Sequence, residues 1–170
     1  MAIVVLFLGL GLVACGAAPD SGRSPQAQVL RVIDGSTLEV QRLDQPNAIP
    51  EQVRLLGVEA PDLRQVPWGP DAQAQLSQWT AGQSVRLEFS QPGRDRDNRL
   101  LAYVWQENTL INEALAREGL ALVSQQANGS PYERQLRYAQ GEARTLGRGI
   151  WDPDQPMGTS PAEFRDTNVP

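Results

Sequence analysis

Residues 53–64 have the sequence VRLLGVEAPDLR, which changes character halfway along. The first half is apolar apart from Arg54, as is typical of a buried strand. Glu59 and Asp62 then flank an Ala-Pro pair that turns the chain. Because an extended chain advances about 3.3 Å per residue, Arg54 and Glu59 cannot meet on a straight strand. If these polar groups converge, the strand must bend sharply, and Gly57 is the residue that permits the bend.

Four further strands and one helix surround this segment in the sequence. Alternating or β-branched apolar residues predict strands at residues 27–33, 37–43, 83–89 and 99–106. Ala72, Leu76 and Trp79 recur at helical spacing and predict a helix over residues 69–79, between the third and fourth strands. Five short strands with one embedded helix indicate an α+β protein, mainly β, built on a small Greek-key barrel of the OB kind.

The last part of the predicted domain is helical. A helix over residues 111–119 ends at a glycine, and we interpret Asn112 within it as structural. A second helix follows, with Ser130 as its predicted N-cap and Glu133 completing a capping box. Gly147 marks its end. The folded domain is therefore expected to span residues 27–151.

The two ends of the chain differ in composition from this domain. Residues 2–13 are an uncharged apolar run, and LVAC, which ends at Cys15, resembles a bacterial lipobox. We interpret residues 1–14 as a lipoprotein signal peptide, Cys15 as the lipidated residue and residues 15–26 as a tether. The alternative is a buried N-terminal strand with a chance cysteine. Residues 152–170 are Pro-rich, and we expect them to lack regular structure.

Composition narrows the chemistry. The net charge is −5 and the pI about 4.8, which argues against tight non-specific binding of nucleic acid. All 15 basic residues are arginines, and there is no histidine. Histidine bases, histidine metal ligands and lysine Schiff bases are thereby excluded. The single cysteine excludes an intrachain disulfide and a cysteine-based zinc site. Carboxylates, arginines, hydroxyls and a hard cation remain.

Three motifs together resemble the staphylococcal nuclease-like (thermonuclease) family. They are VIDGST at residues 32–37, VRLLGVEAPD at 53–62 and DRDNRLLAY at 95–103, in the family's order. The resemblance covers nearly all of residues 27–151. It implies an OB-fold barrel, a Ca²⁺ ion and hydrolysis of phosphodiester bonds in DNA and RNA.

The resemblance also assigns roles to individual residues. Arg54 and Arg99 are expected to bind the phosphate, and Asp62 stands where the family has the residue that positions water or acts as a base. The implied calcium ligands are Glu59, Ser36 and Asp34. Ser36 replaces a carboxylate, and calcium affinity depends on the number of ligand charges. The metal site is therefore expected to be weak. Asp62 is one methylene shorter than the family's glutamate, so hydrolysis is expected to be slow.

The same residues also allow less specific interpretations. Taken alone, Arg54 and Arg99 are solvated arginines on strands, and Glu59 and Asp62 form a polar turn. The leading hypothesis is a monomeric extracytoplasmic nuclease, attached to a membrane through Cys15 or secreted, that acts on nucleic acid. The alternative is a non-catalytic OB-fold module that binds nucleic acid or protein at the cell envelope. A third is a structural envelope lipoprotein.

Overall fold

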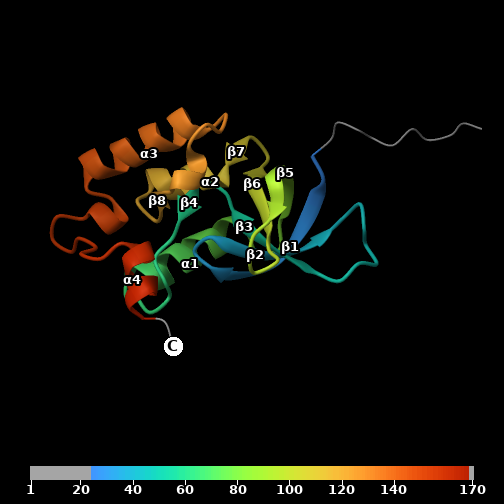
Figure 1. Cartoon of the computed structure of the whole chain (residues 1–170), viewed down its shortest axis with the longest axis horizontal. Coiled ribbons are helices and arrows are strands. Elements are labelled where there is room, and N and C mark those ends of the chain that lie inside the picture. The colour runs from blue at the N-terminus through green and yellow to red at the C-terminus, as the bar shows by residue number, and fades with distance from the viewer. Residues whose placement is uncertain (1–23, 169–170) are drawn as a thin grey trace, which may run out of the picture.

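Five strands close into a barrel in the computed structural model, which describes residues 24–168 (Figure 1). The barrel strands are β1 (Gln26–Asp34), β2 (Thr37–Arg42), β3 (Glu51–Leu55), β5 (Ser84–Arg94) and β6 (Leu100–Gln106). Neighbours pair antiparallel in the order β3-β2-β1-β5-β6, and a parallel pairing of β3 with β6 closes the ring. The short strand β7 (Thr109–Leu110) extends the sheet beside β6. The predicted five-stranded OB barrel is confirmed.

Three helices stand in the regions predicted to be helical, although α3 begins later than predicted, and a fourth helix is added. They are α1 (Trp68–Thr80), α2 (Ile111–Arg117), α3 (Glu133–Leu146) and α4 (Pro161–Thr167), with 3-10 turns η1 (Gln125–Ala127) and η2 (Gly149–Trp151). The helix α1 precedes β5 and packs on β1, whereas α2 follows β6 and packs on both α3 and β6. Within residues 24–168, no helix combines the length and the apolar character that a bilayer span requires.

The barrel core follows the period of two that the strands impose. Leu38 and Val40 of β2 and Val53 and Leu55 of β3 are fully buried, while the residues between them are more exposed. Leu100 to Val104 of β6 are all buried. An uninterrupted buried run is expected there because α2 packs against this strand from outside the barrel.

The bend predicted after β3 is present. Strand β3 ends at Leu55, and the next strand, β4 (Val58–Glu59), leaves the barrel to pair with β8 (Leu122–Val123). Gly57 between them has φ +75°, a conformation that suits glycine. A β-carbon at this position would lie 2.9 Å from a methyl carbon of Leu136. Gly57 is therefore required both by the backbone and by the packing of α3.

A buried asparagine fixes the chain at this bend. The Asn112 side chain, which has no exposed surface, donates from Nδ2 to the carbonyl of Leu56 at 2.8 Å. Its Oδ1 accepts the backbone N–H of Val104 at 2.9 Å. One amide thus joins α2, β6 and the bend, in agreement with its structural interpretation.

The predicted start of α3 is wrong. The N-cap of α3 is Tyr132, not Ser130, and no side chain caps this helix. The Tyr132 ring packs edge-on against Tyr103 at 4.6 Å and Trp105 at 5.7 Å between centroids. Glu133 accepts the backbone N–H of Gly129 at 2.7 Å instead of closing a capping box. Contacts with the barrel therefore decide where the helix begins.

The expected loose tail contains a helix. Helix α4 begins with a true capping box, in which the Ser160 side chain accepts the N–H of Glu163 and the Glu163 carboxylate accepts the N–H of Ser160. Regular structure thus extends beyond the domain end expected at residue 151. The signal peptide and the lipidated Cys15 expected near the N-terminus lie outside the described residues.

We expect Asn112→Ala to lower the free energy of unfolding by about 3 kcal/mol, because it leaves two buried backbone groups without hydrogen-bond partners. Urea denaturation followed by tryptophan fluorescence measures this loss. Asn108→Ala is the matched control, since Asn108 is exposed in a turn, and its effect should stay within about 0.5 kcal/mol. Equal losses in the two variants would show that the buried amide does not fix the bend.

Candidate active site

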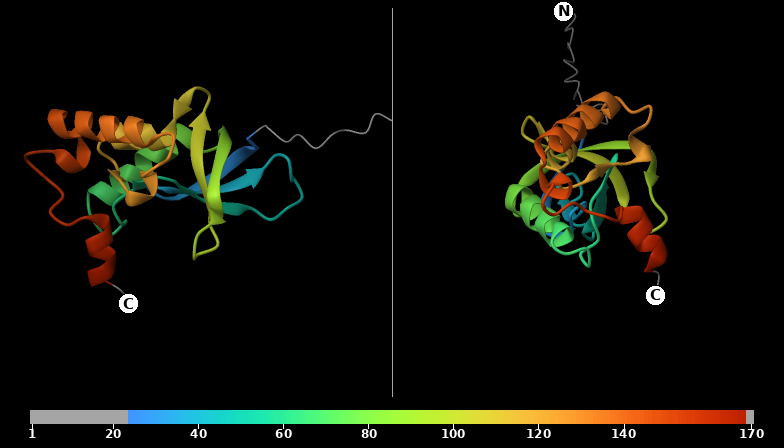
Figure 2. Two further views of the ribbon diagram at one scale, coloured as in Figure 1. Left: turned by 45° about the horizontal axis from the view of Figure 1, so that its top comes forward. Right: turned by 90° about the vertical axis from the view of Figure 1, so that its left-hand side faces the viewer.

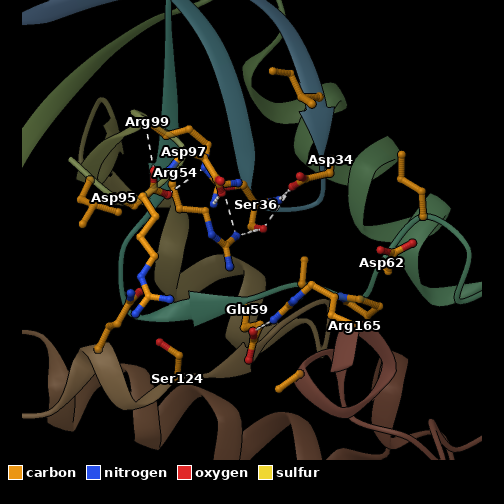
Figure 3. A pocket seen from close by; sticks show the side chains of 18 of the residues that line it. Asp34, Ser36, Arg54, Glu59, Asp62, Asp95, Asp97, Arg99, Ser124 and Arg165 are labelled. Carbon is orange, nitrogen blue, oxygen red and sulfur yellow. Dashed lines mark hydrogen bonds and ion pairs between the residues drawn. The ribbon is translucent and has the colours of Figure 1, made fainter. Parts of the chain in front are cut away.

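All six residues predicted to bind phosphate, position water or hold calcium line one open cleft beside the barrel. The cleft has a volume of about 900 Å³ (Figure 3). The six residues are Asp34, Ser36, Arg54, Glu59, Asp62 and Arg99. They come from the β1–β2 turn, from β3, from β4 and the loop after it, and from the β5–β6 turn. The bend at Gly57 makes this convergence possible, because it brings residues after β3 back to the mouth of the barrel.

The β1–β2 turn and β3 meet in a chain of hydrogen bonds. The carboxylate oxygen Oδ1 of Asp34 accepts the backbone N–H of Ser36 at 2.8 Å and its hydroxyl at 3.1 Å. The Ser36 hydroxyl in turn accepts a hydrogen bond from the guanidinium of Arg54. Gly35 lets the turn approach α1, because a β-carbon there would lie 2.6 Å from that of Ala72. The turn is therefore fixed in place by packing.

Arg54 is partly buried, and its charge is poorly compensated. Burial lowers the pKa of its guanidinium from 12.5 to about 10. The carboxylate of Asp34 opposes this shift. The positive charges of Arg99 and Arg165 add to it, which places three guanidiniums within electrostatic reach of one another. Arg54 remains protonated at neutral pH, and a bound anion would relieve the repulsion.

Arg99 is held at the cleft by the β5–β6 turn. Its Nε donates to Asp95 at 2.8 Å, and its Nη2 lies 3.0 Å from a carboxylate oxygen of Asp97. Asp95 also accepts the backbone N–H groups of Arg99 and Asp97, at 2.9 and 3.0 Å. These bonds hold the pKa of the Asp95 carboxyl below its usual value, although burial opposes them. Asp95 thus positions Arg99, a role that the sequence analysis did not assign.

Glu59 lines the cleft, but its carboxylate is engaged. It forms an ion pair with Arg165 of α4, which Figure 3 draws beside Glu59 with a dashed line joining the two side chains. The sequence analysis missed Arg165, because residues 152–170 were expected to lack regular structure. The signal that could have found the helix is Ser160-Pro-Ala-Glu163, which has the pattern of a helix start.

Asp62 also lines the cleft, yet its carboxylate is paired with Arg64 and not with Arg54 or Arg99. Its carboxylate accepts from Arg64, at 2.8 Å from Nε and 3.1 Å from Nη2. The hydrogen bonds from the Arg64 side chain lower the pKa of the Asp62 carboxyl, and the backbone N–H of the same residue adds to this effect. Asp62 is therefore an ionised acceptor at neutral pH and a weak base.

The cleft contains oxygen atoms of the type that bind a hard cation, but few of them come from the predicted metal ligands. Carboxylates of Asp34 and Glu59 and the hydroxyl of Ser36 are the oxygen ligands that calcium prefers. In the described part of the chain, no three His, Cys, Asp or Glu side chains are arranged as a metal-binding group. The donor chemistry of these residues therefore suits calcium, with two carboxylates and one hydroxyl as the side-chain ligands that would hold it.

A closed barrel that directs arginines into an open cleft defines the class of protein. It is an OB-fold protein whose cleft is equipped to bind a phosphate ester, because guanidinium groups match phosphate oxygens in shape and charge. Among the described residues that line the cleft there is no histidine or cysteine, so its charged and hydroxyl groups are those of arginines, carboxylates and serines.

Comparison with known proteins specifies the family. The family described as "Staphylococcal nuclease homologue" matches residues 52–153. The thermonuclease of Staphylococcus hyicus is 33% identical over 73% of this chain and 74% of its own length. The thermonuclease of Staphylococcus intermedius is 34% identical over the same shares. An uncharacterized endonuclease of Haemophilus influenzae is 27% identical over 95% of this chain and 84% of its own length. The chain belongs to the staphylococcal nuclease family.

Proposed function

We propose that this protein is a calcium-dependent nuclease that hydrolyses phosphodiester bonds in DNA or RNA, slowly compared with family members that keep the full set of carboxylates. The observation that carries the proposal is the convergence of Arg54 and Arg99 with the Asp34 and Glu59 carboxylates in one open cleft. The relatives named thermonuclease and endonuclease support the reaction class.

Arg54 and Arg99 would bind and neutralise the phosphoryl group. Charge develops on its oxygens as water attacks, and fixed guanidiniums stabilise that charge without reorganising. Each arginine is already oriented, Arg54 by the hydroxyl of Ser36 and Arg99 by the carboxylate of Asp95. The lowered pKa of Arg54 supports this role, because a phosphate anion would stabilise its charged form.

Asp62 would position the attacking water. A carboxylate whose pKa is lowered accepts a hydrogen bond from water but removes a proton poorly. We therefore assign Asp62 an orienting role and expect deprotonation of the water to be slow.

Asp34, Glu59 and Ser36 would hold the calcium ion. When bound, the ion supplies positive charge to a phosphoryl oxygen and acidifies bound water. The aromatic residues of the described chain take no part in lining the cleft, so base stacking would contribute little. The substrate would be recognised through its backbone, with little sequence preference.

The competing function is a non-catalytic nucleic-acid-binding module. The Glu59–Arg165 ion pair favours this second function, because Arg165 is bound to a carboxylate that was predicted to bind calcium. Degradation of labelled DNA and RNA with calcium and with a chelator separates the two functions. Cleavage that stops with the chelator supports the nuclease, whereas binding without cleavage under either condition supports the module.

We also propose that the protein is attached to a membrane through Cys15, on the evidence of LVAC followed by a Pro- and Ser-containing tether. Mass spectrometry of the protein purified from its native host should find a lipid-modified cysteine at the N-terminus and no residues 1–14. An intact Met1 would contradict this proposal.

Arg99→Ala is expected to lower the single-turnover cleavage rate at saturating calcium by about 100- to 1000-fold, because the phosphoryl charge loses a fixed partner. Arg31→Ala is the matched control, since Arg31 forms an ion pair with Glu39 elsewhere on the barrel. Its rate should equal that of the wild type. Similar rates for the wild type and Arg99→Ala would remove Arg99 from the mechanism.

Ser36→Asp should tighten calcium binding about tenfold, because a charged ligand replaces a neutral hydroxyl. Isothermal titration calorimetry without nucleic acid measures this change. Thr109→Asp, which adds the same charge at an exposed position on β7, controls for overall charge and should leave the affinity unchanged. An unchanged affinity in Ser36→Asp would show that residue 36 does not contact the ion.

A further inference from the structure

Helix α4 is fastened to the loop that forms one wall of the cleft. After η2 the chain passes to α4, which stands apart from α3 (Figure 2). Gln65 is a buried residue, 5% exposed. Its side chain donates to the carbonyl of Thr159 at 2.9 Å and accepts the N–H of Asp62 at 2.9 Å. The guanidinium of Arg64 lies 5.3 Å from the ring centroid of Phe164. The last helix is thus attached to the segment that carries Asp62.

This attachment places a positive charge at the predicted calcium ligand. Arg165, one residue after Phe164, extends into the cleft and pairs with the carboxylate of Glu59. It is one of four arginines that line the cleft, together with five carboxylates. The family match ends at residue 153, so α4 lies outside it. The pair is therefore not explained by the features that define the family.

We propose that Arg165 is a positioning residue that holds Glu59 until a divalent cation displaces it, so that α4 sets the calcium concentration at which the site assembles. This inference rests on the proposed function, because it takes Glu59 as a calcium ligand. The Arg165 guanidinium pairs with Oε1 of Glu59. A bound cation would compete with it, because two positive charges would then lie side by side at one carboxylate.

The energies suit a displaceable contact. The side chains of Arg165 and Glu59 are 43% and 21% exposed, and ion pairs this close to water contribute little to stability. A doubly charged ion bound by several oxygens can exceed that. All seven residues of α4 are described, and only Pro161 among them is buried. Releasing Arg165 therefore exposes little apolar surface, and the helix can move without unfolding the barrel.

The test is calcium binding to the full chain, measured by calorimetry in the absence of nucleic acid. Arg165→Gln keeps a long polar side chain but removes the charge, and it should tighten binding by up to about fivefold. Arg165→Lys retains the charge and should bind nearly as the wild type does. Arg31→Gln is the matched control, because it breaks an ion pair with Glu39 outside the cleft, and it should leave the affinity unchanged.

A second measurement follows the helix itself. In the wild type, saturating calcium should speed hydrogen–deuterium exchange in residues 161–167, while exchange in α3 stays constant. In Arg165→Gln, exchange in these residues should be fast already and should respond little to calcium. A purely structural role for Arg165 would not link the protection of α4 to calcium.

The outcomes separate this inference from the proposed function. Equal calcium affinity in the wild type and Arg165→Gln overturns the inference and leaves the nuclease proposal standing. Weaker binding in Arg165→Gln also overturns it, since Arg165 would then support the ion. If no variant binds calcium, Ser36→Asp included, the inference and the calcium requirement both fail. If cleavage then persists in the presence of a chelator, the protein is a nuclease that does not require calcium.

Discussion

The site depends on one constraint, which is the bend that takes the chain out of the barrel between β3 and β4. A strand that continued straight would carry Glu59 about 16 Å from Arg54. Gly57 permits the turn, and the buried amide of Asn112 holds it by joining the Leu56 carbonyl to the backbone of β6. A buried amide with both sides satisfied has one favourable orientation, so it specifies geometry as well as stability. The polar groups of the cleft are supported on this apolar and hydrogen-bonded frame.

Much of the fold could be predicted from the sequence, because burial imposes a repeat that is visible locally. Leu38 and Val40 show the alternation of buried residues that is typical of a strand. The order of strands and helices then limits the number of possible topologies. Local patterns fail where distant contacts compete. Ser130 and Ser160 both begin the pattern Ser-Pro-x-Glu, yet only the second caps a helix. Near the first, Tyr132 packs on barrel aromatics and delays the start of α3.

For the candidate site, the sequence allowed the residues to be predicted but not the contacts between them. The motifs identified residues such as Arg54 and Arg99, which the structure brings to one cleft. They could not identify side-chain partners, because a hydrogen bond between distant residues leaves no local signal. Arg99 has its partner Asp95 four residues away, within reach of motif analysis. Arg165 meets Glu59 across more than a hundred residues, and only tertiary structure reveals that pair.

Ser36 has opposite effects on Arg54 and on the predicted cation site. Its hydroxyl accepts a hydrogen bond from Arg54 without neutralising the guanidinium, whose charge stays available to an anion. A carboxylate there would hold a cation more tightly, and it would also pair with the guanidinium. The cleft already carries five carboxylates against four arginines, so an approaching phosphodiester meets no net positive charge. A divalent cation at Glu59 would reverse that balance, because its two charges would exceed the one negative charge in excess. In this chain, calcium would therefore govern the binding of the substrate as well as its cleavage.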